Sequence, residues 1–478
     1  MRTGTGLSRP PESCITGHGH LLFNPAAPVH GGPRPHWYAT PVPRGNVTVA
    51  LFVVICVIAV ALIFDFTNGF HDSANAMAGP IATGALTPRT AVILAAVLNV
   101  VGACLSTEVA KTISGGFFDE KLVTPVIVLA GLTGAIIWNL ITWLFGLPSS
   151  SSHALFGGLI GAVIIGAGLQ SVHFWVVISK VFLPAVAAPV VAGLAAAAAI
   201  KISDVITRDL PKKKAAKKGF RNAQAFTAAL VALAHGTSDG QKTMGVITLV
   251  LIAANLQAPD SGPHWWVIGL AGFAIGLGTY SGGWRIMRTL GKGIVKIDTE
   301  QGAAAGSATA ATILASAHLG FGLSTTHVST GSIIGSGIGR KGSDVRWSVA
   351  RRMVYAWLLT LPGAAVVGGA ASLLADQGLV GTIILLASLG AACLVIYLVS
   401  RRNAVDRTNV TESPEVLVLN AAKPNKIAKA QRKYAKRLAK QAALDAGRVP
   451  AHVGGLSSEP ESTEDQRAQH ANRGSEAS

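Results

Sequence analysis

The sequence contains little charge, and negative charge is the scarcer kind. Only 13% of its 478 residues are Asp, Glu, Lys or Arg, while 50% are hydrophobic. Soluble domains usually carry about 25% charged residues, so this composition excludes an ordinary soluble protein. Acids number 23 against 40 bases, which gives a net charge of +17. The mean hydropathy of +0.47 predicts a polytopic protein of the lipid bilayer.

Cysteine is scarce as well, and one nucleotide-binding signal is missing. The four cysteines, Cys14, Cys56, Cys104 and Cys393, form no CxxC pair. We therefore expect neither a disulfide framework nor thiol redox chemistry. No GxxxxGK[ST] loop is present, which argues against a transporter driven directly by ATP. Nothing in the pattern requires a cofactor or a resident metal ion.

The basic excess is concentrated in two segments. Between Arg208 and Arg221 seven positive residues accompany one acid, and between Arg401 and Arg448 twelve accompany four. Few aromatic side chains for base stacking lie among them, so we expect no nucleic-acid partner. The positive-inside rule instead places both segments on the cytoplasmic side of the cell membrane.

Apolar runs and composition divide the chain into five predicted parts. Residues 1–45 are rich in Pro, Gly and His, lack the layout of a signal peptide, and are predicted to be a disordered leader. Membrane repeats are expected at 46–200 and 223–400, joined by a basic linker at 201–222 and followed by a basic tail at 401–478. The run lengths predict about 10–12 membrane segments in total, because a span needs about 20 apolar residues.

Two polar motifs occur in the same order in both halves. They are GFHDSANA (69–76) and GLPSSSSH (146–153), then HGTSDGQK (235–242) and GFGLSTTH (320–327). Asp72 precedes His153 by 81 positions, and Asp239 precedes His327 by 88. This recurrence indicates an internal repeat. Because each motif interrupts an apolar run, we expect discontinuous helices, which are typical of a transporter with its site at the repeat interface.

Each repeat has one acid at the first of these interruptions, Asp72 or Asp239. A carboxylate at membrane depth is costly and marks a functional site, where it could carry a proton or bind a cation. The alternative is an Asp that only caps a broken helix. Asn75 is either an oxygen ligand or a hydrogen-bonding contact between helices. Lys242 is placed to pair with Asp239 or to meet an anion.

The hydroxyl-rich motifs favour an anion. The candidate phosphate ligands are Ser150, Ser151, Ser152, Ser324, Thr325 and Thr326. They open two predicted re-entrant half-helices, Pro148–Gly168 and Gly322–Gly339, whose N-termini would offer N–H donors and positive dipole ends. His153 and His327 follow directly and could donate to the anion or relay a proton. Hydroxyls that only bond a neighbouring helix, and structural histidines, are the alternatives.

At these motifs the sequence resembles the inorganic phosphate transporter (Pit) family, over roughly Val47 to Val399. The family signatures have Asn before each Asp and Pro at the start of each hydroxyl motif; here His71, Ser238 and Gly322 depart from them. A Phe-His-Asp sequence is similar to the bacterial low-affinity branch, which couples to protons. The resemblance implies an inverted-repeat membrane fold and phosphate symport with protons, sodium or a divalent metal–phosphate complex.

These observations predict an all-α polytopic membrane protein with two inverted repeats, discontinuous helices and re-entrant half-helices. Its predicted function is secondary active symport of inorganic phosphate with protons, because an imidazole weakens a sodium site and adds a titratable group. The predicted coupling residues are Asp72, Asp239, Asn75 and His71, and the predicted supporting residues are His153, His327, Gln241 and Lys242.

Several alternatives stay open at this point. They are sodium coupling, a neutral metal–phosphate complex as substrate, sulfate or another oxyanion, a passive channel, and assembly as a homodimer. An intramembrane hydrolase built on Ser152, His153 and Asp72 is disfavoured. Adjacent Ser and His side chains rarely face each other for catalysis, and no G-x-S-x-G elbow is present. We therefore do not expect an enzyme.

Overall fold

The computed structural model describes residues 47–208, 213–259, 261–402 and 404–410. Residues 1–52 and 53–478 form two separate units, and the account below concerns the second. The secondary structure of the described ranges consists of helices, and the β-pairing there is limited to two isolated bridges, Phe118–Val172 and Val295–Val345. The predicted leader and nearly all of the predicted tail lie outside the described residues.

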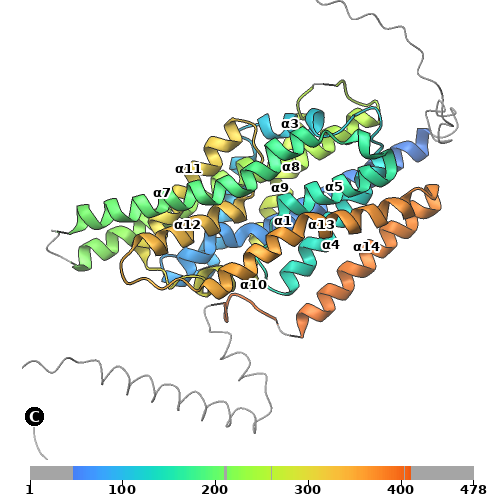
Figure 1. Ribbon diagram of the computed structural model, residues 1–478. Helices are drawn as coiled ribbons and strands as arrows, with labels where there is room; N and C mark the ends of the chain where they lie inside the picture. The colour runs from blue at the N-terminus through green and yellow to red at the C-terminus, as the bar shows by residue number, and fades with distance from the viewer. Residues whose placement is uncertain (1–46, 209–212, 260, 403, 411–478) are drawn as a thin grey trace, which may run out of the picture. The chain divides into compact units, whose positions relative to one another are not determined.

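Seven α-helices of the described ranges lie in each half of the chain (Figure 1). The first half contains α1 (Val47–Thr83), α2 (Pro88–Ala103), α3 (Glu108–Gly116), α4 (Pro125–Leu144), α5 (Ser151–Ala167), α6 (Phe174–Val177) and α7 (Leu183–Thr207). The second contains α8 (Lys213–Ala253), α9 (Trp265–Ser281), α10 (Trp284–Gly293), α11 (Thr299–His318), α12 (Thr325–Gly339), α13 (Trp347–Ala375) and α14 (Gly378–Arg401). The all-α prediction is confirmed.

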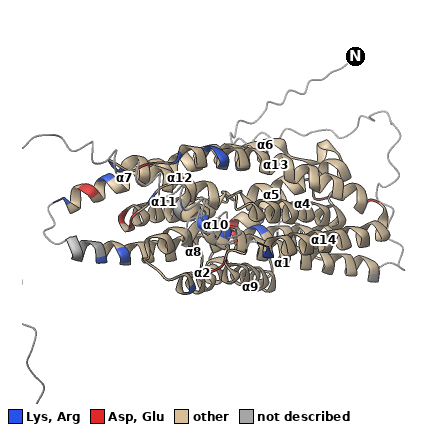
Figure 2. Ribbon diagram, turned by 90° about the horizontal axis from the view of Figure 1, so that it is seen from below, with Lys and Arg blue, Asp and Glu red and all other residues tan. Residues whose placement is uncertain are grey.

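Several of these helices can cross a bilayer by length and composition. Five qualify among the described residues: Val49–Thr83, Pro125–Leu144, Phe174–Thr207, Trp347–Ala375 and Gly378–Arg401. The pair α2 and α3, bent by 64°, counts as a sixth if it is one span, and α5 and α9 are shorter apolar helices. Large apolar side chains such as Val366 and Leu358 are exposed, as lipid-facing residues are. Figure 2 shows that most of the ribbon carries no charged residue.

The two Asp-containing motifs lie within continuous helices, contrary to the predicted breaks. Helix α1 continues through His71 and Asp72, and α8 joins the predicted runs Ala223–Ala234 and Gly245–Leu256 into one helix of 41 residues. Polar side chains lower the local hydropathy, but they do not remove the backbone hydrogen bonds of a helix. The sequence pattern therefore marked polar positions inside helices, and the prediction of broken helices there was wrong.

The hydroxyl motifs, in contrast, do begin short helices. Helix α5 starts after Ser150, whose side chain accepts a hydrogen bond from the backbone N–H of His153 at 3.1 Å. Helix α12 starts after Ser324, which caps the N–H of His327 in the same way at 3.3 Å. Serine is a preferred N-cap because its oxygen satisfies a free N–H of the first turn. The two copies thus build matching helix starts.

Helices of one half pack closely against helices of the other. Helix α5 packs on α13, visible side by side in Figure 1, and α12 packs on α7. A Cβ atom added at Gly157 of α5 would lie 2.3 Å from the carbonyl oxygen of Leu361, and one at Gly331 of α12 would lie 2.3 Å from that of Pro189. Small residues permit this backbone approach. The reciprocal packing brings the four motifs together.

Candidate functional site

The carboxylate of Asp72 joins both hydroxyl motifs. Its Oδ2 accepts hydrogen bonds from Ser151 of α5 and from Thr325 of α12, the latter at 3.5 Å. Its Oδ1 accepts from Thr326 at 3.3 Å and lies 2.6 Å from Nδ1 of His71. All five residues are buried. The first turns of two half-helices, one from each repeat, therefore meet at one acid of α1.

Two neighbours of Asp72 on α1 extend this network. Asn75 donates through Nδ2 to the hydroxyls of Thr325 at 3.2 Å and Thr326 at 3.0 Å. The other ring nitrogen of His71, Nε2, lies 3.3 Å from the hydroxyl of Ser149. Asn75 is thus a hydrogen-bonding contact between helices, at a position where it also faces the predicted anion ligands.

The second acid is paired with a buried ammonium. Lys242 donates from Nζ to Asp239, to the hydroxyl of Ser152 at 2.6 Å, and to the carbonyl oxygen of Leu323 at 3.1 Å. Lys242 and Asp239 are both fully buried. The pairing with Asp239 expected from the sequence is present, and the same ammonium contacts the first hydroxyl motif.

The two acids share a neighbourhood. Thr325, already bonded to Asp72, has its hydroxyl 3.5 Å from Oδ2 of Asp239. His235 places Nε2 at 3.4 Å from the same oxygen. Ligand atoms of Asp72, His235 and Asp239 all lie within 4.8 Å of one another, a spacing at which they could hold a cation. Helix N-termini, hydroxyls and an ammonium suited to an anion thus adjoin carboxylates suited to a cation or a proton.

The two histidines that follow the hydroxyls face each other. The rings of His153 and His327 have centroids 4.7 Å apart, and His327 also packs on Trp357 at 4.1 Å. Nδ1 of His327 lies 3.3 Å from the carbonyl oxygen of Ala185. Their backbone N–H groups are capped by the preceding serines. The structure therefore places the rings against one another, behind the hydroxyls that contact Asp72.

Gln241 lies apart from the hydroxyl motifs. Its Oε1 accepts from the backbone N–H groups of Val109 at 2.8 Å and Ala110 at 3.4 Å, at the first turn of α3. Free N–H groups of a first helical turn need such acceptors. In this structure Gln241 anchors α3 to α8.

Three buried residues near the site were not singled out from the sequence. Nδ1 of His235 lies 3.0 Å from Oδ1 of Asn99, and Asn99 donates to Thr279 at 2.7 Å. Asp65, seven residues before Asp72 on α1, is also fully buried. A single amide in the run 90–105, and an acid inside an apolar helix, were the signals that could have identified Asn99 and Asp65.

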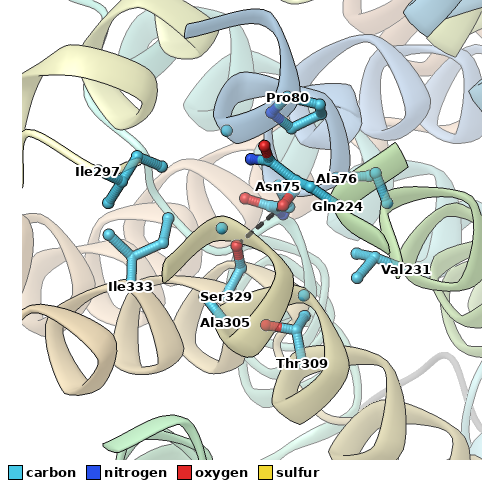
Figure 3. A pocket seen from close by; sticks show the side chains of 14 residues that line it. Asn75, Ala76, Pro80, Gln224, Val231, Ile297, Ala305, Thr309, Ser329 and Ile333 are labelled. Atoms are coloured by element: carbon cyan, nitrogen blue, oxygen red, sulfur yellow. Dashed lines mark hydrogen bonds between the residues drawn. The ribbon is translucent and has the colours of Figure 1, made fainter. Parts of the chain in front are cut away.

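A small cavity borders the site on the side of Asn75 (Figure 3). Its volume is about 30 Å³, and its polar lining includes Gln224, Thr309 and Ser329. Ser329 donates to the carbonyl oxygen of Asn75 at 2.9 Å, the dashed line in Figure 3. This volume accommodates about two water molecules and not a tetrahedral oxyanion.

Comparisons with known proteins show similarities in sequence and in fold. Residues 68–368 match the model of the phosphate transporter family. A relative from Mycobacterium bovis, described as a probable low-affinity inorganic phosphate transporter, is 53% identical over 363 residues, covering 75% of this chain and 87% of the relative. A Bacillus subtilis protein of the same description is 42% identical over 325 residues, covering 68% and 97%. A solved structure, the sodium-dependent phosphate transporter, is similar with a TM-score of 0.58 at 24% identity, covering 69% of this chain and 100% of that one, and supports the fold.

Proposed function

Since the chain belongs to the phosphate transporter family, we propose that it is a secondary active symporter that takes up inorganic phosphate together with protons. The family and the relatives show that the chain is a multi-pass membrane phosphate transporter and not an enzyme. The observation that carries the proposal is the meeting of both hydroxyl motifs at Asp72, next to the pair Asp239–Lys242.

Phosphate binds, in this proposal, at the first turns of α5 and α12. The donors are the hydroxyls of Ser150, Ser151, Ser152, Ser324, Thr325 and Thr326, with the ammonium of Lys242. Ser150 and Ser324 use an oxygen lone pair as helix caps and keep their O–H free to donate. The contact between Lys242 and Ser152 supports this assignment, because it brings a positive charge to the hydroxyls.

The coupled protons are carried by the acids that face this anion. A bare phosphate ion at the bilayer midplane costs many kcal/mol, and protonation of neighbouring groups removes much of that cost. Asp72 and His71, which are hydrogen-bonded, can share one proton. Asp239 and Asn75 are the other two residues that we assign to proton coupling. His153 and His327, whose rings contact each other, are assigned a supporting role next to the hydroxyl motifs.

Two variants of this function use the same residues. Asp72, His235 and Asp239 could hold a sodium ion in place of a proton, as the name of the similar solved structure suggests for that protein. Alternatively, phosphate enters as a neutral complex with a divalent metal. We favour protons because His71 supplies a titratable imidazole directly on Asp72, and imidazole is a poor ligand for sodium.

Transport requires the site to open alternately to the two sides. We assign this motion to the two repeats, inverted relative to each other, which contact one another through the glycine faces of α5 and α12. The basic linker at 201–222 and the tail after residue 401 lie on the cytoplasmic side of the cell membrane in this proposal.

Reconstitution tests the coupling ion. Purified protein in proteoliposomes is supplied with labelled phosphate while the pH gradient, the sodium gradient and the magnesium concentration are varied one at a time. We expect an inward proton gradient alone to accumulate phosphate above its outside concentration, which also excludes a passive channel. Uptake that needs sodium and ignores pH would contradict the proposal. Excess sulfate should not compete, because near neutral pH it lacks the O–H that phosphate can donate to Asp72.

A further inference from the structure

A stripe of four polar side chains runs along one face of α1. Asp65, Asn68, Asp72 and Asn75 stand at positions i, i+3, i+7 and i+10, which share a helix face. They are 0%, 1%, 2% and 8% exposed. The stripe is about 15 Å long at 1.5 Å per residue. Asn75 ends it at the cavity of Figure 3, and Asp65 ends it on the opposite side of Asp72.

Asp65 lacks the partners that Asp72 and Asp239 have. Neither of its carboxylate oxygens has a hydrogen-bond partner among the described residues. Beside it lie the amide of Asn68 and the hydroxyl of Thr243, whose side-chain polar atoms are also buried without a hydrogen bond. An ionised carboxylate in these surroundings is very costly, whereas a neutral carboxylic acid can donate its O–H to either neighbour.

The charged groups near Asp65 come mainly from α8. They are Asp239 and Lys242, while the ammonium of Lys242 is held by Asp239, Ser152 and a backbone carbonyl. His235 lies one turn before Asp239, and His71 lies with Asp72 farther along α1. Helices α4 and α9 contain no acid, base or histidine. No cationic side chain therefore forms an ion pair with Asp65 in the described chain.

We propose that Asp65 is a proton-binding site of the transport cycle, separate from Asp72 and Asp239. This inference rests on the proposed proton-coupled function. Phosphate at the hydroxyl motifs faces Asp72 and Asp239, and Asp65 lies close enough to Asp239 for their charges to interact. An O–H bond formed at Asp65 removes one negative charge from this group of three carboxylates. Protonation then favours phosphate binding, and by linkage bound phosphate favours protonation to the same extent. The O–H bond breaks after phosphate has left and the opened site admits water to Asp65, and the proton passes to that water.

Asp65→Asn tests the site because it preserves size and hydrogen-bonding capacity but cannot titrate. In proteoliposomes we expect this variant to retain measurable phosphate exchange. Its maximal accumulation should fall about tenfold per unit of pH gradient, the contribution of one coupled proton. Asp376→Asn, which removes an exposed acid at the end of α13, is the matched control and should accumulate phosphate like the wild type. Wild-type accumulation by Asp65→Asn would overturn the inference.

Infrared difference spectroscopy reports on the proton directly. Adding phosphate to wild-type protein should change the C=O stretching bands of protonated carboxylic acids, and Asp65→Asn should lack one of these bands while those of Asp72 and Asp239 remain. A phosphate-induced spectrum of Asp65→Asn that keeps every wild-type band would overturn the assignment, as would the absence of such bands from the wild type. If Asp65→Asn fails to insert, Thr243→Val serves instead: a shifted band supports the site, and an unchanged band contradicts it. If phosphate uptake by the wild-type protein does not depend on pH, proton coupling itself is refuted. That outcome differs from a failure of the Asp65 assignment alone.

Discussion

The two acids of the repeat occupy matching places in the sequence but different surroundings in the structure. Asp72 is surrounded by the hydroxyls of Ser151, Thr325 and Thr326 and by one imidazole. Asp239 is bound to the ammonium of Lys242, with His235 at 3.4 Å. One acid has a permanent positive partner, while the other has only dipoles and a group that can gain or lose a proton.

This difference separates the framework from the chemistry of the repeat. The framework is duplicated. A serine caps the N-terminus of both α5 and α12, and glycines let each of these helices pack closely against a helix of the other half of the chain. The charges are not duplicated, since the residue three positions after the acid is Lys242 in the second motif and Asn75 in the first. A symmetric scaffold thus carries an asymmetric charge distribution.

The largest expected effect is loss of coupled uptake when either acid is neutralised. Asp72→Asn and Asp239→Asn should each lower labelled phosphate uptake to background, because the coupled charge is lost. The amount of protein inserted in the membrane should not change, because Asn preserves the size of the side chain. Uptake assays normalised to the inserted protein measure both. Near-normal transport by both variants would refute their role.

Lys242→Met probes the permanent pair. It leaves Asp239 buried without its counter-charge, so we expect a loss of about 3–5 kcal/mol in stability, measured by thermal unfolding in detergent. Adding Asp239→Asn should restore most of that stability without restoring transport. Lys111→Met is the matched control, because it removes an exposed pair with Glu108 that contributes at most about 1 kcal/mol. Equal stability of the two lysine variants would show that Asp239 does not depend on Lys242.

The smallest expected effects concern the duplicated framework. Gly157→Ala and Gly331→Ala each place a Cβ 2.3 Å from a backbone oxygen of the other half, so each should destabilise the protein by about 1–3 kcal/mol. Similar losses at the two positions would support equivalent packing, and a large difference would argue against it. Gly269→Ala, with nothing within 4 Å of its added Cβ, should leave the melting temperature unchanged.

Much of the site could be predicted from the sequence because its signals are local. Hydroxyls before an apolar run predict that short helices start at these motifs, and the structure has helix starts at Ser151 and Thr325. The pairing of Lys242 with Asp239 follows from their spacing on one helix. The breaks predicted within α1 and α8 were wrong, because a drop in hydropathy reports side-chain polarity and not the path of the backbone. Asp65 lies in the same stretch of lowered hydropathy as Asp72 and was not predicted as a site residue. Its spacing to Asn68 and Asp72 in the sequence already places the three side chains on one helix face.

The sequence by itself determined the membrane class, the four recurring motifs and the starts of two short helices, because each depends on composition or on residues a few positions apart. Only the tertiary structure decided which hydroxyls reach Asp72, that Lys242 extends to Ser152, and that neither carboxylate oxygen of Asp65 has a hydrogen-bond partner among the described residues. These contacts join residues up to about 250 positions apart in the chain. They depend on how closely glycine faces let the two halves approach, which no local pattern encodes.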